Sequence, residues 1–304
     1  MMKKIRQKIW SILYRLGLTG ILSDEKFAKA LYWFRLGRRL DLEHPSDFNE
    51  KIQWMKLNYH NPLLVRCADK YEVRSFVKDR VGEKYLNKCI GVYKKVEEIP
   101  YEELPRSFVL KATHGSGWNI VCADKNKLDW ATAKSKMRKW LKLDFSRVGR
   151  EWQYSQMQHR IICEEFLSDG NQTILRDYKV FTFGGVVKYI WVDYYKKNEN
   201  GKLLRYRNFY DTKWRYIPGC GSLFPNGKDE DIERPECLRE MIDVAERLGG
   251  DFPHCRVDFY VLEDGRKLVF GEMTFTCGNG VNEFFPQSFA KELGDCFELP
   301  SRYL

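Results

Sequence analysis

RVDFYVLEDGRKLVFGEMTF, residues 256–275, contains two runs of alternating residues that are rich in β-branched and aromatic side chains. Such runs are typical of β-strands, and the pair Asp264-Gly265 between them is a strong signal for a hairpin. We therefore predict a β-hairpin that carries one carboxylate on each strand, Asp258 and Glu272.

The length of the turn decides whether these two carboxylates face each other. A two-residue turn would place Asp258 opposite Gly271 and would direct Glu272 to the other face of the sheet. An odd loop centred on Gly265 would place Asp258 directly opposite Glu272, and we expect this arrangement. Two adjacent carboxylates repel unless a cation or a proton lies between them, and their hard oxygens suit Mg²⁺. The alternative is a half-exposed hairpin whose acids merely face water.

The composition is that of a globular protein with anionic partners. The 304 residues are 43% hydrophobic and 15% aromatic, which excludes a disordered chain and allows two or three packed lobes. The formal charge of +10 fits nucleotides, acidic sugars or a membrane surface, and no motif for nucleic-acid binding is present. Nine cysteines without CxxC pairs and five histidines indicate neither a disulfide framework nor a zinc site, so a reducing cytosol is the simplest compartment.

An amphipathic helix is predicted at the beginning of the chain. Arg15 interrupts its apolar run and no small-residue cleavage site follows, so the segment is not expected to be a signal peptide. The helix either packs on the body of the protein or lies on an anionic membrane, with Trp10 as an interfacial anchor. The apolar residues at helical spacing are Ile5, Ile9, Ile12, Leu13 and Leu16, with lysines and arginines close by.

Further helices are predicted at residues 25–40, 48–57, 63–81, 128–143 and 236–248. The third of these carries Asp69-Lys70. Lys70 is a candidate phosphate ligand, although an exposed lysine on a helix is the ordinary case.

A glycine-bearing loop, residues 113–119, follows the short strand at residues 107–112. Lys111 precedes the glycines, whereas in a P-loop the lysine follows them, so a P-loop is excluded. We expect a β-hairpin flap above Lys111 whose backbone amides close over phosphates, and a plain turn is the alternative.

Residues 161–167 change from apolar to polar and back, as expected where a chain crosses between two lobes. Adenine would lie against such a crossing.

A second hairpin is predicted from residues 176–183 and 186–192, with Asp177 and Lys179 on one of its faces. Residues 196–227 are charged, aromatic and rich in glycine, and we expect a long excursion that touches substrate or a solvated loop.

The order of these features resembles the ATP-grasp superfamily. The shared motifs are Asp69-Lys70, F-V-L-K ending at Lys111, H-G-S-G, I-C-E-E-F-L, R-V-D-F-Y and F-G-E-M-T-F. The chain is more closely similar to the TupA-like branch, named for a teichuronopeptide biosynthesis protein. The motifs of that branch are F-N-E-K-I-Q-W from Phe48, A-D-K-Y from Ala68, D-Y-K-V from Asp177, and Phe209-Tyr210-Asp211 followed by Trp214.

This resemblance implies an α+β fold of the ATP-grasp type, in which two α+β lobes clasp a nucleotide. We divide the chain into basic N-terminal helices at residues 1–42, a helical segment at 43–105 and the nucleotide- and metal-binding core at 106–304.

The resemblance also implies the roles of individual residues. ATP would contact Lys70, Lys111, His114, Gly115, Ser116, Gly117, Glu164, Glu165 and Leu167. Mg²⁺ would be held by Asp258, Glu272 and Thr274. Arg256 would face the developing charge, and Lys179 is expected as a second catalytic residue.

One residue departs from the family pattern. Many ATP-grasp ligases have Glu, an apolar residue and then Asn, whereas here the third place is Thr274, whose single oxygen favours one metal ion over two. Thr274 is also the best argument for a non-catalytic nucleotide-binding protein.

The activity that the resemblance implies is an ADP-forming ligase of bacterial surface-polysaccharide assembly. It would join an acidic sugar or amino acid to an amine through an acylphosphate. A glycosyltransferase of the same pathway is the other alternative. Its metal-binding acid motif is lacking, because Asp229-Glu230-Asp231 lies in a charged loop.

Overall fold

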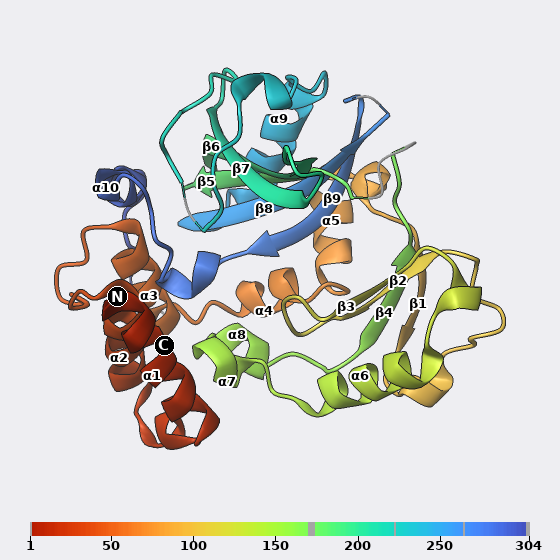
Figure 1. Cartoon of the computed structure of the whole chain (residues 1–304), viewed down its shortest axis with the longest axis horizontal. Coiled ribbons are helices and arrows are strands. Elements are labelled where there is room, and N and C mark those ends of the chain that lie inside the picture. The colour runs from red at the N-terminus through yellow and green to blue at the C-terminus, as the bar shows by residue number, and fades with distance from the viewer. Residues whose placement is uncertain (1, 170–173, 222, 264, 302–304) are drawn as a thin grey trace.

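The computed structural model describes residues 2–169, 174–221, 223–263 and 265–301 (Figure 1). These residues form helices and two antiparallel β-sheets, so the fold is α+β, as predicted. The helices are α1 (Met2–Arg15), α2 (Asp24–Leu36), α3 (Phe48–Asn58), α4 (Pro62–Ala68), α5 (Val73–Val81), α6 (Trp130–Lys142), α7 (Ser146–Gly149), α8 (Trp152–Ser155), α9 (Leu238–Gly249) and α10 (Gln287–Asp295). The strands are β1 (Cys89–Tyr93), β2 (Phe108–Ala112), β3 (Asn119–Cys122), β4 (Ile161–Glu165), β5 (Asp177–Phe183), β6 (Val186–Lys197), β7 (Leu203–Asp211), β8 (His254–Leu262) and β9 (Lys267–Thr274).

The smaller sheet has the strand order β1-β4-β2-β3 and belongs to the lobe at the right of Figure 1. β2 alternates buried residues, such as Phe108 and Leu110, with half-buried ones, so one face of the sheet is apolar. α6 begins after its N-cap Asp129 and buries Met137 in the core of this lobe. β1 belongs to the predicted helical segment at residues 43–105, yet it pairs with β4 of the predicted core at residues 106–304. The division of the chain at residue 105 stays a prediction.

The larger sheet has the strand order β7-β6-β5-β8-β9, and α9 packs on it. α9 buries Leu238, Met241 and Leu248, as its helical spacing predicts. Within residues 196–227, which were predicted to be an excursion or a solvated loop, residues 203–211 form β7 instead. Charged residues of β7 pair across the sheet with β6, so the strand lacks the apolar alternation by which strands are recognised.

Residues 63–81 form two helices instead of the single helix predicted. The side chain of Asp69 accepts hydrogen bonds from the backbone N–H groups of Tyr71 (2.8 Å) and Glu72 (3.0 Å). These bonds stabilise a turn between α4 and α5, because an aspartate side chain competes with helical hydrogen bonding. Lys70 therefore lies in a turn and not on a helix.

β8 and β9 form the hairpin predicted from residues 256–275, and Asp258 pairs with Glu272 as expected. The reason given for this register is wrong. Leu262 pairs with Lys267, so the loop between the strands has an even number of residues. Asp264, the first residue of the predicted turn, lies outside the described residues.

A β-bulge restores the register that the loop by itself would not give. The pairing shifts between Phe259, which pairs with Phe270, and Asp258, which pairs with Glu272, and leaves Gly271 as the extra residue. A β-carbon at Gly271 would lie only 3.0 Å from the carbonyl oxygen of Asp258, so glycine suits this position. The bulge places the two carboxylates on the same face.

The N-terminal helices α1 and α2 pack side by side at the lower left of Figure 1. Trp10 is buried against Phe27 and Phe34, with ring centroids 5.3 and 5.4 Å apart, so its prediction as an interfacial anchor is wrong. The apolar stripe of α1 does not pack on the body, since Ile5, Ile9, Ile12 and Leu16 are exposed. In the part of the chain that the structure describes, no helix has the length and apolar character needed to cross a membrane.

Candidate active site

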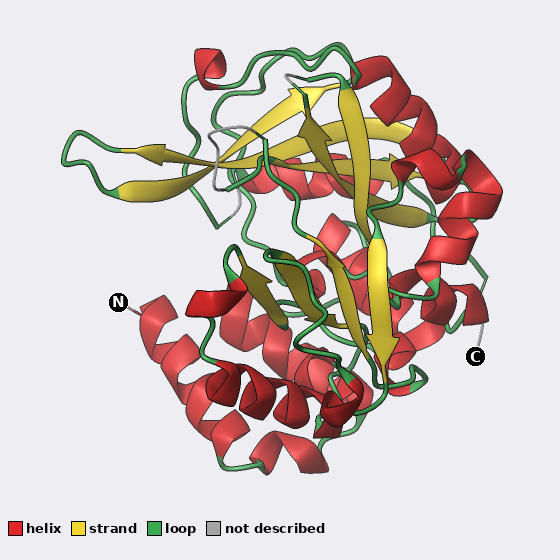
Figure 2. Ribbon diagram, turned by 90° about the vertical axis from the view of Figure 1, so that its right-hand side faces the viewer, coloured by secondary structure: helices red, strands yellow, loops and turns green. Residues whose placement is uncertain are grey.

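A cavity of about 500 Å³ lies between the two sheets, which face each other in Figure 2. Valine, phenylalanine and leucine side chains line much of it, and charged groups lie among them. A flat aromatic base with a charged tail suits such walls. Residues that line the cavity include Val109, Lys111 and Val121 of the smaller lobe, Glu165, Phe166 and Leu167 of the crossing, and Asp177 and Tyr260 of the larger lobe.

Lys111 is held beside this cavity by Glu164. The lysine Nζ lies 2.7 Å from Oε2 of Glu164, and Nη1 of Arg74 lies 3.2 Å from Oε1 of the same carboxylate. Glu164 is buried on β4, next to the strand that carries Lys111. The structure therefore gives the Glu164 carboxylate a contact with two cations, whereas the family resemblance had placed this residue beside adenine.

Lys70 connects the two lobes. Its Nζ donates a hydrogen bond to the carbonyl oxygen of Gly115 (2.6 Å) and lies 3.7 Å from Oε2 of Glu272. Its backbone N–H donates to the carbonyl oxygen of Thr113 (3.2 Å). The turn that begins with Asp69 thus holds a cation between the glycine loop and the β8–β9 hairpin.

The glycine loop forms the predicted hairpin connection between β2 and β3. Ser116 and Gly117 lie exposed at its tip, and Gly117 has a φ of 71°. A β-carbon at Gly115 would lie 2.6 Å from the ring of Trp118, so the loop passes too close to this ring for a larger residue. Its tip is free to approach a ligand with backbone N–H groups.

His114 lies inside the smaller lobe. Its ring stacks on His159 with centroids 3.9 Å apart, and its Nε2 is 3.0 Å from the carbonyl oxygen of Trp140. The side chain has no exposed surface, so in this conformation it cannot contact a nucleotide. Burial, together with the neighbouring His159, lowers the pKa of His114 to about 4. The imidazole acts here as packing for the loop.

We expect the free energy of unfolding to decrease as the pH falls from 6.5 towards 4, with a contribution from His114. The histidine pKa is lower in the folded chain than in the unfolded chain, so acid protonates the unfolded chain first and draws the equilibrium towards it. Between roughly pH 7 and pH 5 this contribution is about 2 kcal/mol.

Urea unfolding of the wild type and of His114→Gln at these two pH values measures this contribution. The variant is expected to be less stable at neutral pH but to lose less stability in acid. Equal losses in the two proteins would contradict the neutral, buried state of His114.

Asp258 is held by two cations on the cleft face of the larger sheet. Nε and Nη2 of Arg256 each lie 2.6 Å from one of its oxygens, and Nζ of Lys179 lies at 3.0 Å. Lys179 also pairs with Asp177. Burial opposes the charge on Lys179, but Asp258 and Asp177 outweigh it and raise the lysine pKa. Both predicted catalytic residues thus contact a predicted metal ligand.

Glu272 lies where cations from both lobes converge. Burial by itself would raise its pKa, but the positive charges of Lys70, Arg256, Lys179 and Lys111 lower it to about 2. Lys70 and Lys111 come from the smaller lobe and its flanking turn, and the other two from the larger sheet. Glu272 is therefore ionised under ordinary conditions and faces a strongly positive site.

Oxygens of Asp258, Glu272 and Thr274 lie together at the hairpin, and both oxygens of Asp258 already contact Arg256 or Lys179. The Thr274 hydroxyl donates to Oε1 of Glu272 (3.3 Å) and accepts from Nη2 of Arg256 (3.0 Å). Within the described ranges, no three His, Cys, Asp or Glu side chains are grouped so that they could hold a metal ion. Carboxylate and hydroxyl oxygens are hard donors of the kind that Mg²⁺ prefers.

Two buried ion-pair groups beside the cleft are not apparent from the sequence. Asp193 accepts hydrogen bonds from Arg205 and Arg207, each at 2.6 Å, and Asp193 and Arg205 line the cavity. Asp69 lies 3.2 Å from Arg160. Because the paired residues are separated in the sequence, no local motif predicts the pairs. Only the basic and aromatic character of residues 205–207 indicated that this segment has a role at the cleft.

The geometry of this site agrees with a family relationship. The family model described as TupA-like ATP-grasp matches residues 50–298. The chain belongs to the TupA-like ATP-grasp family. The predicted family and the ATP-grasp fold type are thereby confirmed. No curated protein matches this TupA-like chain.

Solved structures with a similar fold include ATP-grasp ligases. The ATP-grasp ligase PsnB, in complex with a minimal precursor, is 10% identical with a TM-score of 0.41, over 75% of this chain and 60% of that chain. D-alanine–D-alanine ligase from Helicobacter pylori is 11% identical with a TM-score of 0.43, over 84% and 68%. The N5-carboxyaminoimidazole ribonucleotide synthetase PurK, in complex with ADP, is 12% identical with a TM-score of 0.38, over 84% and 58%. The TupA-like chain thus spans about three fifths of the length of PsnB and PurK.

Proposed function

We propose that this TupA-like chain is an ATP- and Mg²⁺-dependent ligase that activates a carboxylate and transfers it to an amine. The observation that carries the proposal is the position of Glu272, which lies among lysines and an arginine from both sides of the cleft. Transfer of a phosphoryl group needs such an arrangement, because positioning and neutralisation of charge account for most of its catalysis. The family membership supports the same conclusion.

The residues of the cleft divide into three groups by what they contact in this proposal. The cavity beside the crossing segment holds the base, with Glu165 and Leu167 in its wall. Lys111, Lys70 and the loop at residues 115–117 bind the phosphates, the loop through its backbone. Lys179 orients Asp258, and Arg256 faces the transferred phosphoryl group. These contacts exclude water and hold the reacting groups in line.

Asp258, Glu272 and the Thr274 hydroxyl are the residues that would hold Mg²⁺. When bound, the ion neutralises charge on the β- and γ-phosphate oxygens. Thr274 offers one hydroxyl where many ATP-grasp ligases have the side-chain amide of an asparagine, so we propose one metal ion and not two.

The proposed reaction has two balanced steps. An oxygen of the substrate carboxylate bonds to the γ-phosphorus while the bond from phosphorus to the β,γ-bridging oxygen breaks, which gives an acylphosphate and ADP. The amine nitrogen then bonds to the acyl carbon, phosphate leaves, and the amine loses a proton to water. No covalent intermediate with the protein is needed, because the chain acts by positioning and by its positive charge.

The substrate class follows from the charge of the chain and from its family. A net charge of +10 suits an anionic sugar or an acidic amino acid as the carboxylate substrate. We place the reaction in bacterial surface or capsular polysaccharide biosynthesis on the basis of the TupA-like family. The nine cysteines, which have no CxxC pairs, favour a cytoplasmic active site.

Release of ADP tests the proposal. The protein is mixed with ATP, Mg²⁺ and pairs of uronic or amino acids with amines, and the expected result is ADP release that needs both members of a pair. Hydroxylamine should trap the acylphosphate as a hydroxamate when the amine is omitted. ATP binding without ADP release over the whole panel would favour a non-catalytic nucleotide-binding protein, and release of nucleoside diphosphate from a nucleotide sugar would favour a glycosyltransferase.

A further inference from the structure

A line of aliphatic side chains along α1, which we call the isoleucine stripe, is exposed to solvent. Its members follow at intervals of three and four residues, so they lie on one face of the helix. Their exposed fractions range from 43% for Ile9 to 73% for Met2, and Ile21, just beyond the helix, is 85% exposed. The stripe consists of Met2, Ile5, Ile9, Ile12 and Leu16, and Leu18 and Ile21 continue it.

Contacts on another face of α1 fix the direction of the stripe. Trp10 is buried in the small core formed with α2, where its ring meets Phe27 edge-on. Lys3 pairs with Glu283. Because these contacts already use the face of α1 that is turned to the body, the helix cannot bury the stripe by rotating. The exposure is therefore a property of the folded chain, and a contiguous apolar surface of this kind marks an interaction site.

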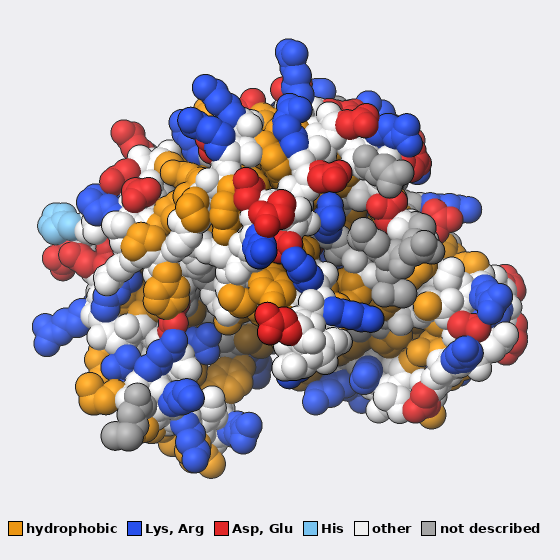
Figure 3. Space-filling view, turned by 45° about the horizontal axis from the view of Figure 1, so that its top comes forward, with side chains coloured by type: hydrophobic (Ala, Val, Ile, Leu, Met, Phe, Trp, Pro, Cys, Tyr) orange, Lys and Arg blue, Asp and Glu red, His pale blue; other side chains and the backbone are white. Residues whose placement is uncertain are grey.

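The charge beside the stripe selects its partner. Lys4, Lys8 and Arg15 are exposed on α1, and residues 2–22 contain no acidic side chain. In Figure 3, Lys and Arg side chains lie among hydrophobic ones over the lower left of the molecule, where the N-terminal helices are. A second copy docked stripe to stripe would bring the lysines of the two α1 helices together, and residues 2–22 hold no carboxylate to pair with them. A partner complementary to α1 presents negative charge beside an apolar region.

We propose that α1 binds the surface of an anionic lipid bilayer. The stripe enters the boundary between headgroups and acyl chains, and Lys4, Lys8 and Arg15 contact lipid phosphates. A straight stripe without polar groups or a pocket fits a fluid, flat layer better than the shaped surface of an acidic protein. α1 is about 21 Å long, at 1.5 Å per residue, which suffices to lie in the interface. Membrane binding at α1 is independent of the proposed ligase activity.

Sedimentation with lipid vesicles tests this proposal on the full chain. Vesicles of phosphatidylcholine with about 30% phosphatidylglycerol are compared with pure phosphatidylcholine, because anionic lipid should supply the electrostatic part of binding. We expect the wild type to bind the anionic vesicles, to bind pure phosphatidylcholine at least roughly tenfold more weakly, and to dissociate as salt is raised. Absence of binding to the anionic vesicles would overturn the proposal.

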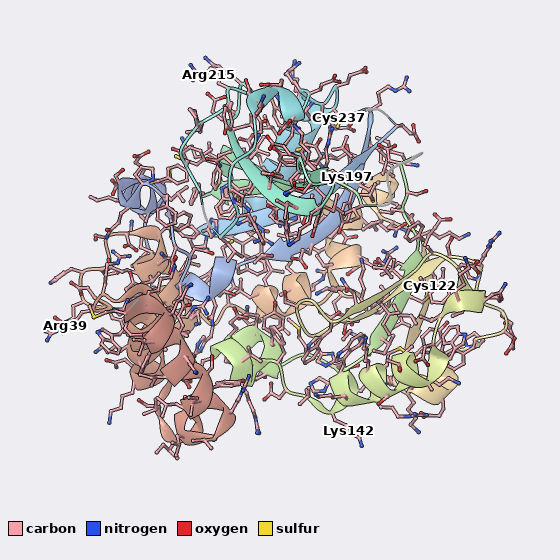
Figure 4. All side chains as sticks on the ribbon, viewed as in Figure 1. Arg39, Cys122, Lys142, Lys197, Arg215 and Cys237 are labelled. Atoms are coloured by element: carbon pink, nitrogen blue, oxygen red, sulfur yellow. The ribbon has the colours of Figure 1, made fainter. Side chains whose placement is uncertain are left out.

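Two pairs of variants separate the apolar and the electrostatic contributions. Ile9→Ser/Ile12→Ser removes the centre of the stripe, and Leu203→Ser is its control, since Leu203 is similarly exposed on β7. Lys4→Glu/Lys8→Glu reverses the charge beside the stripe. Its control is the same double change at Lys139 and Lys142, at the end of α6, where Lys142 points outward in Figure 4.

Both α1 variants are expected to bind anionic vesicles at least roughly tenfold more weakly, whereas both controls bind like the wild type. Circular dichroism and ATP binding are expected to be unchanged, because the exposed side of α1 contacts neither the core nor the cleft. Equal binding by the α1 variants and the controls would overturn the proposal. A wild-type dimer in light scattering that Ile9→Ser/Ile12→Ser dissociates, without vesicle binding, would assign the stripe to self-association instead.

Discussion

Asp258→Asn is expected to lower the free energy of unfolding by about 3 kcal/mol and to remove the Mg²⁺ dependence of ATP binding. The carboxylate is buried and neutralises both Arg256 and Lys179. An asparagine would leave two buried cations without their shared anion, which is the costly way to break a buried ion pair. It would also remove one of the two carboxylates proposed to hold the metal. Urea unfolding, and calorimetry of ATP binding with and without Mg²⁺, measure the two effects.

Two further variants distinguish loss of the fold from loss of the site. Asp231→Asn removes another little-exposed carboxylate of the larger lobe, one that pairs with Lys196, and should destabilise the chain without changing the Mg²⁺ dependence. Asp258→Asn combined with Lys179→Met removes one of the two cations that Asp258 neutralised, although Lys179 also pairs with Asp177, and should regain part of the stability but not the metal response. Wild-type Mg²⁺ dependence in Asp258→Asn would show that this residue is not a metal ligand.

Lys111→Met should weaken ATP binding about 100-fold, because hydrogen bonds between charged groups are worth roughly 1.5–3 kcal/mol. Lys111 is the lysine that lines the cavity directly. Without Lys111, Arg74 is the cation that remains of the two that contact Glu164. A moderate loss of stability is therefore expected as well. Isothermal titration calorimetry and urea unfolding record the two effects separately.

Lys94→Met is the matched control, because Lys94 is exposed and follows β1 in the same lobe. It should bind ATP like the wild type. The double change Lys111→Met/Glu164→Gln removes the carboxylate that has lost one of its two cations and should regain stability while ATP binding stays weak. Wild-type affinity in Lys111→Met would place the phosphates elsewhere in the cleft.

Much of the candidate site could be predicted because its residues lie in short, regular motifs. The run F-V-L-K-A predicts the strand that carries Lys111, and buried and half-buried residues alternate along it. Asp258 and Glu272 lie on a hairpin with a strong turn signal. Strand alternation is local, so it is legible in the sequence. β7 escaped prediction because its arginines are paired with Asp193, a contact that no local pattern contains.

His114 illustrates the opposite case. The motif H-G-S-G predicts a loop with a polar first residue, but the loop turns that residue inward, where it stacks on His159. Sequence pattern cannot tell whether a histidine is solvated or buried, because burial depends on packing against distant segments such as the one that carries His159. Lys70 was predicted on a helix but lies in a turn. Hydrogen bonds to the Asp69 side chain break the helix there, and helical periodicity does not reveal them.

The sequence by itself determined the family, the order of most of the elements and most of the residues that carry charge to the cleft, because these depend on local periodicity and on motifs. The tertiary structure decided which of those residues meet. The even loop of the 256–275 hairpin would separate Asp258 from Glu272, and the bulge at Gly271 brings them to one face. In the same way, burial of Trp10 decided that the isoleucine stripe of α1 faces solvent. Both outcomes depend on packing between segments, and a periodic pattern gives the faces of an element but not what each face will contact.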